Sequence, residues 1–155
     1  MARDARLAYP VWMGKVRGFS VRWLAVVATV ILLSTFAVLG VASPASASGE
    51  GTILSLVNQA CAANGLGPLK LNSAISAVSA AWANQMATNG AMTHNPSYLS
   101  HMPGGWSKAA ENVATGYPSP AAVHTGRMNS AGHRANILGD YTDIGIAFVT
   151  KNGTT

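Results

Sequence analysis

Ser130–Leu138 reads S-A-G-H-R-A-N-I-L and brings a histidine, an arginine and an asparagine into four consecutive positions. The hydroxyl of Ser130 is suited to accept a free backbone N–H group of the helical turn that follows it. Such a cap would hold His133 in the first turn of a helix, in a fixed geometry. The chain has only four histidines, so this turn carries unusual weight in the search for chemistry.

The charge distribution and the cysteine content limit the possible partners and cross-links of the chain. Five of the ten Lys and Arg residues lie before Trp23 with one acid, so the part from Ser48 onward carries five basic against four acidic residues. This nearly neutral part has no basic stripe, which argues against nucleic acid as a partner. Cys61 is the only cysteine, so a disulfide within the chain is excluded. The 155 residues suffice for one domain once a targeting segment is removed.

The N-terminal region has the pattern of an export signal. Trp23–Ala42 contains no charge and follows several basic residues, and Ala45–Ala47 offers small side chains at the spacing a signal peptidase reads. Residues 1–47 are therefore predicted to be a signal peptide, cleaved so that a secreted chain begins at Ser48. A retained, outward-facing membrane anchor is the alternative, because twenty apolar residues can span a bilayer. A start at Met13 would leave a shorter leader of ordinary form.

Local signals predict the elements of residues 53–155, which follow a linker over 48–52. An apolar stripe from Ile53 predicts a helix that ends at Asn64-Gly65. A second helix is expected between a cap at Asn72 or Ser73 and Gly90, with Ile75, Val78, Trp82 and Met86 on its inner face. A third begins at Ser119-Pro120. Residues 97–108 are expected to be irregular, and 143–150 to be a strand inside the sheet.

With these segments in view, the chain resembles the CAP superfamily (cysteine-rich secretory protein, antigen 5, pathogenesis-related 1; the SCP domain) in its bacterial secreted form. The resemblance implies an α+β fold, a three-layer α-β-α sandwich with a central, mostly antiparallel sheet. Five separated segments carry it in the family's order: LVNQACAANGLGPLKLN (Leu56–Asn72), AWANQMATNGAMTHN (Ala81–Asn95), AENVATGY (Ala110–Tyr117), MNSAGHRANIL (Met128–Leu138) and YTDIGIAFV (Tyr141–Val149).

The resemblance also implies a cleft. His94 matches the family's first cleft histidine, Glu111 its acid and His133 its second histidine, and the two histidines can hold a divalent metal, often zinc. The family's second acid aligns with Ser130, and a family tryptophan aligns with Arg127, so the cleft lacks one carboxylate. Two imidazoles with open positions for water would make a reactive rather than a structural zinc site.

Other readings of these residues remain open. Glu111 can instead fix loop amides near residues 133–136, and Ser130, His133 and Glu111 can be drawn as a hydrolytic triad. Arg134 and Asn136 are expected to pin loop carbonyls. His101 and His124 have no counterpart in the family's cleft and are expected on the surface, and Cys61 is expected to be a small buried side chain.

The function expected from the resemblance is that of a secreted, non-enzymatic monomer whose cleft binds a divalent cation or a small apolar or cell-envelope ligand. The rival is a metal-dependent hydrolase or peptidase with Glu111 as general base beside a metal-bound water. A third is a membrane-tethered structural module, held by the uncleaved leader. Lys151-Asn152-Gly153 is a strong hairpin signal. A returning strand should follow it, yet the chain ends at Thr155, so the sheet is expected to lack its last strand and to be marginally stable.

Overall fold

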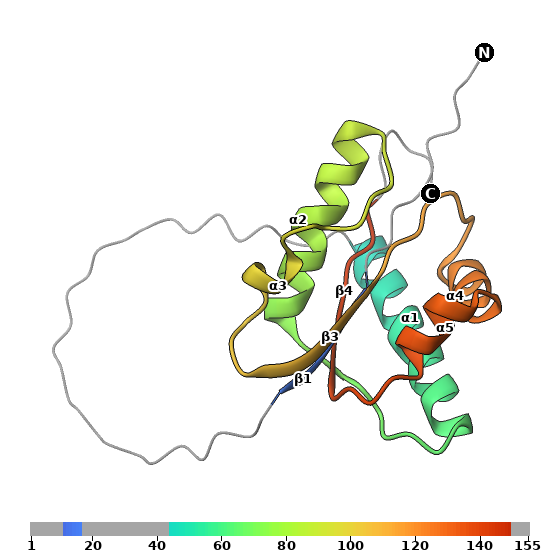
Figure 1. Ribbon diagram of the computed structural model, residues 1–155. Helices are drawn as coiled ribbons and strands as arrows, with labels where there is room; N and C mark the ends of the chain where they lie inside the picture. The colour runs from blue at the N-terminus through green and yellow to red at the C-terminus, as the bar shows by residue number, and fades with distance from the viewer. Residues whose placement is uncertain (1–10, 17–43, 150–155) are drawn as a thin grey trace, which may run out of the picture.

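The computed structural model describes residues 11–16 and 44–149, which form the α+β fold predicted from the sequence (Figure 1). The elements follow one another along the chain as β1 (Val11–Val16), α1 (Pro44–Ala63), β2 (Lys70–Leu71), α2 (Ser73–Asn89), α3 (Tyr98–His101), β3 (Trp106–Asn112), α4 (Pro120–Asn129), α5 (Ala131–Ile137) and β4 (Asp143–Ile146).

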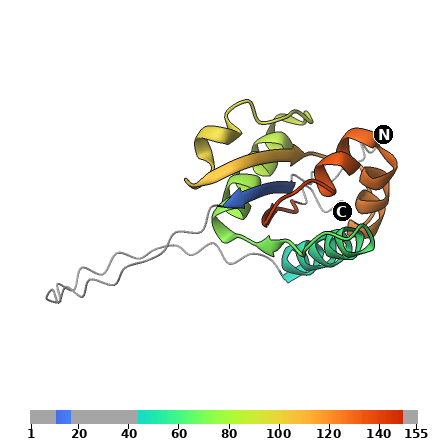
Figure 2. The same ribbon diagram turned by 60° about the horizontal axis from the view of Figure 1, so that its bottom comes forward.

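Helices cover both faces of a four-stranded sheet (Figure 2). The strand order is β2-β4-β1-β3, with β1 antiparallel to both of its neighbours and β2 parallel to β4. On one face α2 and α3 enclose a cluster built on Trp12, Ile75 and Met102. On the other face α1, α4 and α5 enclose the main core. Each of these helices contributes buried side chains to it, among them Ile53 from α1, Val123 from α4 and Ile137 from α5. The three-layer arrangement is thus present.

The central strand comes from the N-terminal region. β1 lies within the predicted leader 1–47, yet it pairs with β3 from Val11↔Asn112 onward and with β4 from Val11↔Ile146 onward. β4 is therefore paired on both sides, by β2 and by β1, rather than left without an antiparallel partner. The Lys151-Asn152-Gly153 turn signal and the apolar run over 23–42 lie outside the described residues. In the described part of the chain, no helix is both long and apolar enough to cross a membrane.

Local capping chemistry fixes the ends of the helices where the sequence predicts them. Asn72 Oδ1 accepts the backbone N–H groups of Ala74 and Ile75 at 3.1 and 3.3 Å, which satisfies donors that the first turn leaves open. α2 ends at Gly90, whose φ of 65° is the left-handed conformation that glycine adopts without strain. Ser119 Oγ accepts the backbone N–H of Ala122 at 3.1 Å and so caps α4.

Three predicted boundaries are wrong, each because packing outweighs local pattern. α1 begins at Pro44, so the predicted linker 48–52 is helical, and Gly49 lies against the ring of Phe148, where a Cβ would be 3.2 Å away. The stretch 97–108, expected to be irregular, contains helix α3 and the start of β3 at Trp106, where β1 pairs with β3. β4 ends at Ile146, short of the predicted 150.

The inner face of α2 also differs from the prediction. Ile75 and Met86 are buried as expected, but Ser79 and Ala83 complete the buried row. Val78 and Trp82 are only half-buried. The start of α2 lies close to β4, since a Cβ added at Gly145 would be 2.4 Å from the Ile75 carbonyl carbon, and the small side chains of Ser79 and Ala83 continue the buried row. Val78 and Trp82 are then free to line a pocket.

Candidate functional site

Glu111 lies near the end of β3 and holds the loop that follows α2. Its side chain is only 4% exposed, and its Oε2 is 2.6 Å from His94 Nδ1. The backbone N–H of Asn95 donates to Oε2 and Oε1 at 3.2 and 3.4 Å. Burial raises the pKa of Glu111, and the hydrogen bonds from His94 and Asn95 offset part of that rise. Glu111 therefore has the alternative role of fixing a loop amide, but the amide belongs to Asn95 rather than to residues 133–136.

The pair with Glu111 orients the imidazole of His94. When Glu111 is ionised, its carboxylate can only accept hydrogen bonds, and Nδ1 then carries the proton between the two groups. Nε2 is then the ring nitrogen left to meet a ligand. The His94 side chain is 66% exposed, so this nitrogen is on a ring that solvent and solutes reach.

Two asparagines tie the end of β3 to α5. Asn112 Nδ2 donates to the backbone oxygen of His133 at 3.0 Å, and Asn112 is fully buried. Asn136 Nδ2 donates to Asn112 Oδ1 at 2.9 Å and to the backbone oxygen of Glu111 at 3.1 Å. This network brings His133 beside the strand that carries Glu111. Asn136 thus has the scaffold role predicted for it, as does Arg134, which donates to the Met128 carbonyl at 2.9 Å.

The Ser130 hydroxyl does not cap the helix as predicted. Ser130 has the extended backbone of an N-cap residue, and its carbonyl accepts the N–H of Arg134 at 2.8 Å. Its Oγ instead lies 2.9 Å from His133 Nδ1, because residues three apart in the first turn share one face of the helix. The hydroxyl therefore orients the His133 ring and leaves Nε2 as the second ring nitrogen for a ligand.

The surroundings of His133 favour its neutral form. Burial lowers the pKa of His133, and the nearby charges of Arg127 and His94 lower it further. Arg127 is itself only 3% exposed and donates to the Asn112 carbonyl at 3.2 Å.

The structure thus brings only some of the predicted site residues into direct contact. Glu111 contacts His94 directly and reaches His133 through Asn112, and its carboxylate bonds to His94 rather than to His133, which is not the arrangement of a Ser-His-acid triad. Within residues 11–16 and 44–149, no three His, Cys, Asp or Glu side chains are grouped to hold a metal ion. A shared ion between His94 and His133 stays a prediction.

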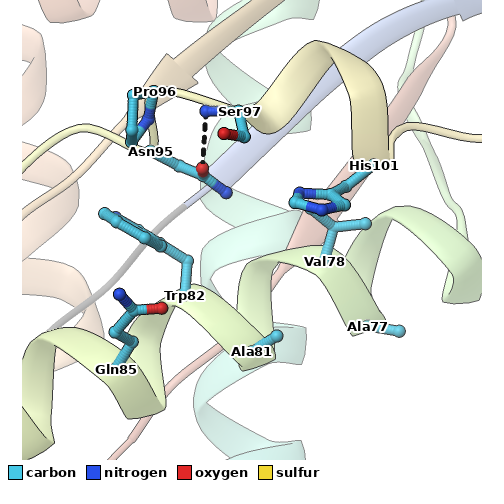
Figure 3. A pocket seen from close by; sticks show the side chains of 9 residues that line it. All are labelled: Ala77, Val78, Ala81, Trp82, Gln85, Asn95, Pro96, Ser97 and His101. Carbon is cyan, nitrogen blue, oxygen red and sulfur yellow. Dashed lines mark hydrogen bonds between the residues drawn. The ribbon is translucent and has the colours of Figure 1, made fainter.

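A pocket that the sequence analysis missed lies next to this cluster (Figure 3). It has a volume of about 630 Å³ and lies between the outer side of α2 and the segment from Asn95 to His101. Val78 and Trp82, which were predicted to lie on the inner face of α2, are only half-buried and line this pocket instead. The lining side chains are Ala77, Val78, Ala81, Trp82, Gln85, Asn95, Pro96, Ser97 and His101.

Asn95 connects the pocket to the buried carboxylate. Its backbone N–H donates to Glu111, while its side chain lines the pocket and accepts the Ser97 N–H at 2.9 Å. On the opposite wall, Trp82 comes from α2 (Figure 3). Its Nε1 donates to the Thr93 carbonyl at 2.8 Å and anchors the same loop to α2. The pocket wall and the His94–Glu111 pair are therefore one hydrogen-bonded unit.

The other two histidines differ from each other. His101 is exposed, as expected, but lines the pocket. The prediction of a surface position is wrong for His124, which is half-buried on α4 with its Nδ1 fully covered and without a hydrogen-bond partner among the described residues. Burial lowers the pKa of His124, and the charge of Arg127 lowers it further. Cys61 is buried as predicted, and burial raises the pKa of its thiol.

Comparison with known proteins assigns the sequence to a family. The profile described as "CAP: Cysteine-rich secretory protein family" matches residues 54–155. A curated relative, "Uncharacterized protein YkwD" of Bacillus subtilis (strain 168), is 31% identical over 116 residues, which cover 69% of this chain and 45% of the relative. The match thus spans less than half of that relative's length. No solved structure matches the chain significantly.

Proposed function

Because this chain belongs to the CAP family of cysteine-rich secretory proteins, and because an apolar pocket adjoins its His94–Glu111 pair, we propose that it is a secreted, non-enzymatic binding domain. Its ligand is a small molecule with an apolar body and a polar end. Proteins of this family are typically secreted, and an apolar ligand of the cell envelope has the required character.

The observation that carries the proposal is the composition of the pocket. Its volume of about 630 Å³ falls within the range of roughly 300–1,000 Å³ in which proteins hold small molecules. Trp82, Val78 and Pro96 offer apolar surface, and the alanines of α2 leave room between them. Five of the nine lining residues are apolar, so burial of an apolar chain against them would be a main source of affinity.

The polar end of the ligand meets the hydrogen-bonding groups at one side of the pocket. Asn95, Ser97 and His101 present an amide, a hydroxyl and an imidazole there. Asn95 is held by Glu111 and by the Ser97 N–H, so its amide is oriented before a ligand arrives. Pre-oriented polar groups lower the entropic cost of binding and select ligands with a matching head group.

The proposal is tested by titrating the full chain with dansyl-undecanoic acid, an apolar chain with a carboxylate end, and following dansyl fluorescence. Ala81→Phe fills the pocket from an exposed position on α2, and Ala62→Phe adds the same ring at an exposed position on α1 as the control. We expect saturable binding by the wild type and Ala62→Phe, and at least about tenfold weaker binding by Ala81→Phe. Equal binding by both variants, or none by the wild type, contradicts the proposal.

A divalent cation such as zinc is the second proposal for this site. It is favoured by the hydrogen bonds at Nδ1 of both His94 and His133, since ligating histidines are commonly held in this way by an oxygen at the other nitrogen. When bound, zinc would polarise a water or a ligand oxygen. Calorimetric titration with zinc should give a heat that His133→Ala removes and His101→Ala keeps; a heat that survives His133→Ala argues against this site.

Hydrolysis with Glu111 as general base is less well supported. Both oxygens of the carboxylate already accept hydrogen bonds, and the side chain is almost fully buried, whereas a general base must reach the proton it removes. Metal-dependent turnover that is lost in Glu111→Gln would favour the hydrolase over the binding domain.

A further inference from the structure

We propose that residues 44–149 form an acceptor for an added β-strand. The slot between β3 and β4 binds the extended segment 11–16, and it also binds that segment as a separate peptide. The ligand class is an extended peptide with an aromatic side chain on one face, aliphatic side chains on the other, and a glycine at its fourth position. In the structure this chain supplies that peptide itself, as β1.

The position of β1 makes the slot a complete site. β3 and β4 are not neighbours in the sheet, and each pairs with β1 in antiparallel register, β3 at Ala110↔Met13 and β4 at Ile144↔Met13. Strands lie about 4.8 Å apart, so without β1 the two flanking strands stand about 10 Å apart. Both would then present a row of unpaired N–H and C=O groups, which is the template that recruits another strand.

Both faces of the slot contain sockets for particular side chains. Trp12 is fully buried on the α2–α3 side, where its ring centroid is 4.2 Å from that of Tyr98 and where it packs with Ile75 and Met102. Val11 and Met13 are equally buried on the opposite side, in the main core. Because side chains alternate between the two faces of a strand, the slot selects a peptide with an aromatic residue between two apolar ones.

The C-terminal half of the segment is held by contacts at Gly14 and Lys15. A Cβ at Gly14 would be 3.3 Å from the Met102 methyl group, so a glycine fits here without any shift of the Met102 side chain. The Gly14 carbonyl accepts hydrogen bonds from Thr142 N and Oγ1 at 3.1 and 3.2 Å. Lys15 adds an exposed ion pair with Asp140 at 2.5 Å, which contributes little in water. These contacts fix the register of the segment but do not involve its covalent connection to α1.

This arrangement links the slot to processing of the N-terminus. The predicted cleavage between Ala47 and Ser48 lies inside helix α1 and would separate β1 from the rest of the domain. A chain cut there keeps its sheet only if segment 11–16 stays bound or an equivalent strand replaces it. Completion of the sheet and removal of the leader are therefore coupled.

The test uses the full chain with a protease recognition sequence inserted between Gly18 and Phe19. The folded protein is cut and passed through a size-exclusion column, and it is also unfolded in urea and refolded with an excess of a labelled peptide of sequence 9–18. We expect the cut fragments to elute together and the labelled peptide to be incorporated. A peptide with Trp12→Ser should bind at least about thirtyfold more weakly, whereas one with Lys15→Ala should stay within about threefold of the wild type.

Two results overturn the proposal: loss of the N-terminal fragment with an unchanged melting temperature of the remainder, or equal incorporation of the Trp12→Ser peptide. The uncut chain gives an independent measurement. There Trp12→Ser should lower the melting temperature by about 10 °C or more and Lys15→Ala by no more than about 2 °C. Equal melting temperatures of Trp12→Ser and the wild type would show that β1 is not part of the folded sheet.

Discussion

Gly145 on β4 offers the sharpest test of how the layers pack. A Cβ built on Gly145 would lie 2.4 Å from the carbonyl carbon of Ile75 and 2.6 Å from the backbone nitrogen of Ser76. Both atoms belong to the backbone of α2, so no side-chain rotation relieves the contact. Since ordinary contacts begin at 3.4 Å, Gly145→Ala must push the start of α2 away from the sheet by about 1 Å.

The cost follows from two terms. Overpacking of a well-packed core costs about 1–3 kcal/mol. The shift also stretches the hydrogen bond from the Ile146 N–H to Ser76 Oγ, which is 3.1 Å long and worth about 0.5–1.5 kcal/mol. We therefore expect Gly145→Ala to lower the free energy of unfolding by about 1.5–4.5 kcal/mol, a large fraction of the roughly 5–15 kcal/mol that stabilises a domain.

Urea unfolding followed by circular dichroism measures this loss. The matched control is Gly51→Ala, because Gly51 is an exposed position inside α1 with no atom within 4 Å of the added Cβ. The control should gain up to about 1 kcal/mol from the better helix propensity of alanine. A loss of less than about 0.5 kcal/mol in Gly145→Ala would refute the close approach of α2 to β4.

Three further outcomes are expected. The raised pKa of Glu111 means that its contribution to stability is complete below pH 4.5 and is lost as the pH rises through the folded-state value. The free energy of unfolding of Glu111→Gln minus that of the wild type should therefore increase between pH 4 and 7. Parallel pH profiles of the two proteins would contradict this. The lowered pKa of His124 means that its contribution is complete above pH 6.5 and is lost as the pH falls toward the folded-state value, so His124→Gln should reduce the loss of stability on acidification. Cys61 is buried, and its thiol lies 3.6 Å from the Ile137 carbonyl; reaction with a thiol reagent should therefore be no faster than opening of the fold, and rapid reaction in the native protein would argue against this burial.

Local chemistry made some of the fold predictable. Asn72, Gly90 and Ser119 mark helix ends because their cap bonds, or the left-handed φ of Gly90, depend on a few neighbouring residues. The cluster around Glu111 was predicted only through the resemblance to a family, since His94 and Glu111 are far apart in sequence. Which amide the carboxylate holds depends on how the loop at Asn95 returns to β3, and no local pattern encodes that path.

The central strand could not be predicted for a related reason. V-W-M-G-K-V stands before a long apolar run, and in that context its basic residue resembles the start of an export signal. Its partners Asn112 and Ile146 are about a hundred positions away or more along the chain. The sequence did predict that the strand beginning at Asp143 needs an antiparallel partner, but located that partner after Thr155. Cleavage before Ser48 stays a prediction.

Hydrogen–deuterium exchange of the full chain, with and without saturating dansyl-undecanoic acid, tests the proposed binding site most directly. The ligand contacts α2 from Ala77 to Gln85 and the segment from Asn95 to His101, so amide exchange should slow in these two stretches. It should be unchanged in α4, whose residues do not line the pocket. Protection confined to other parts of the molecule, or an exchange pattern that the ligand leaves unaltered, would contradict a binding pocket between α2 and the Asn95 loop.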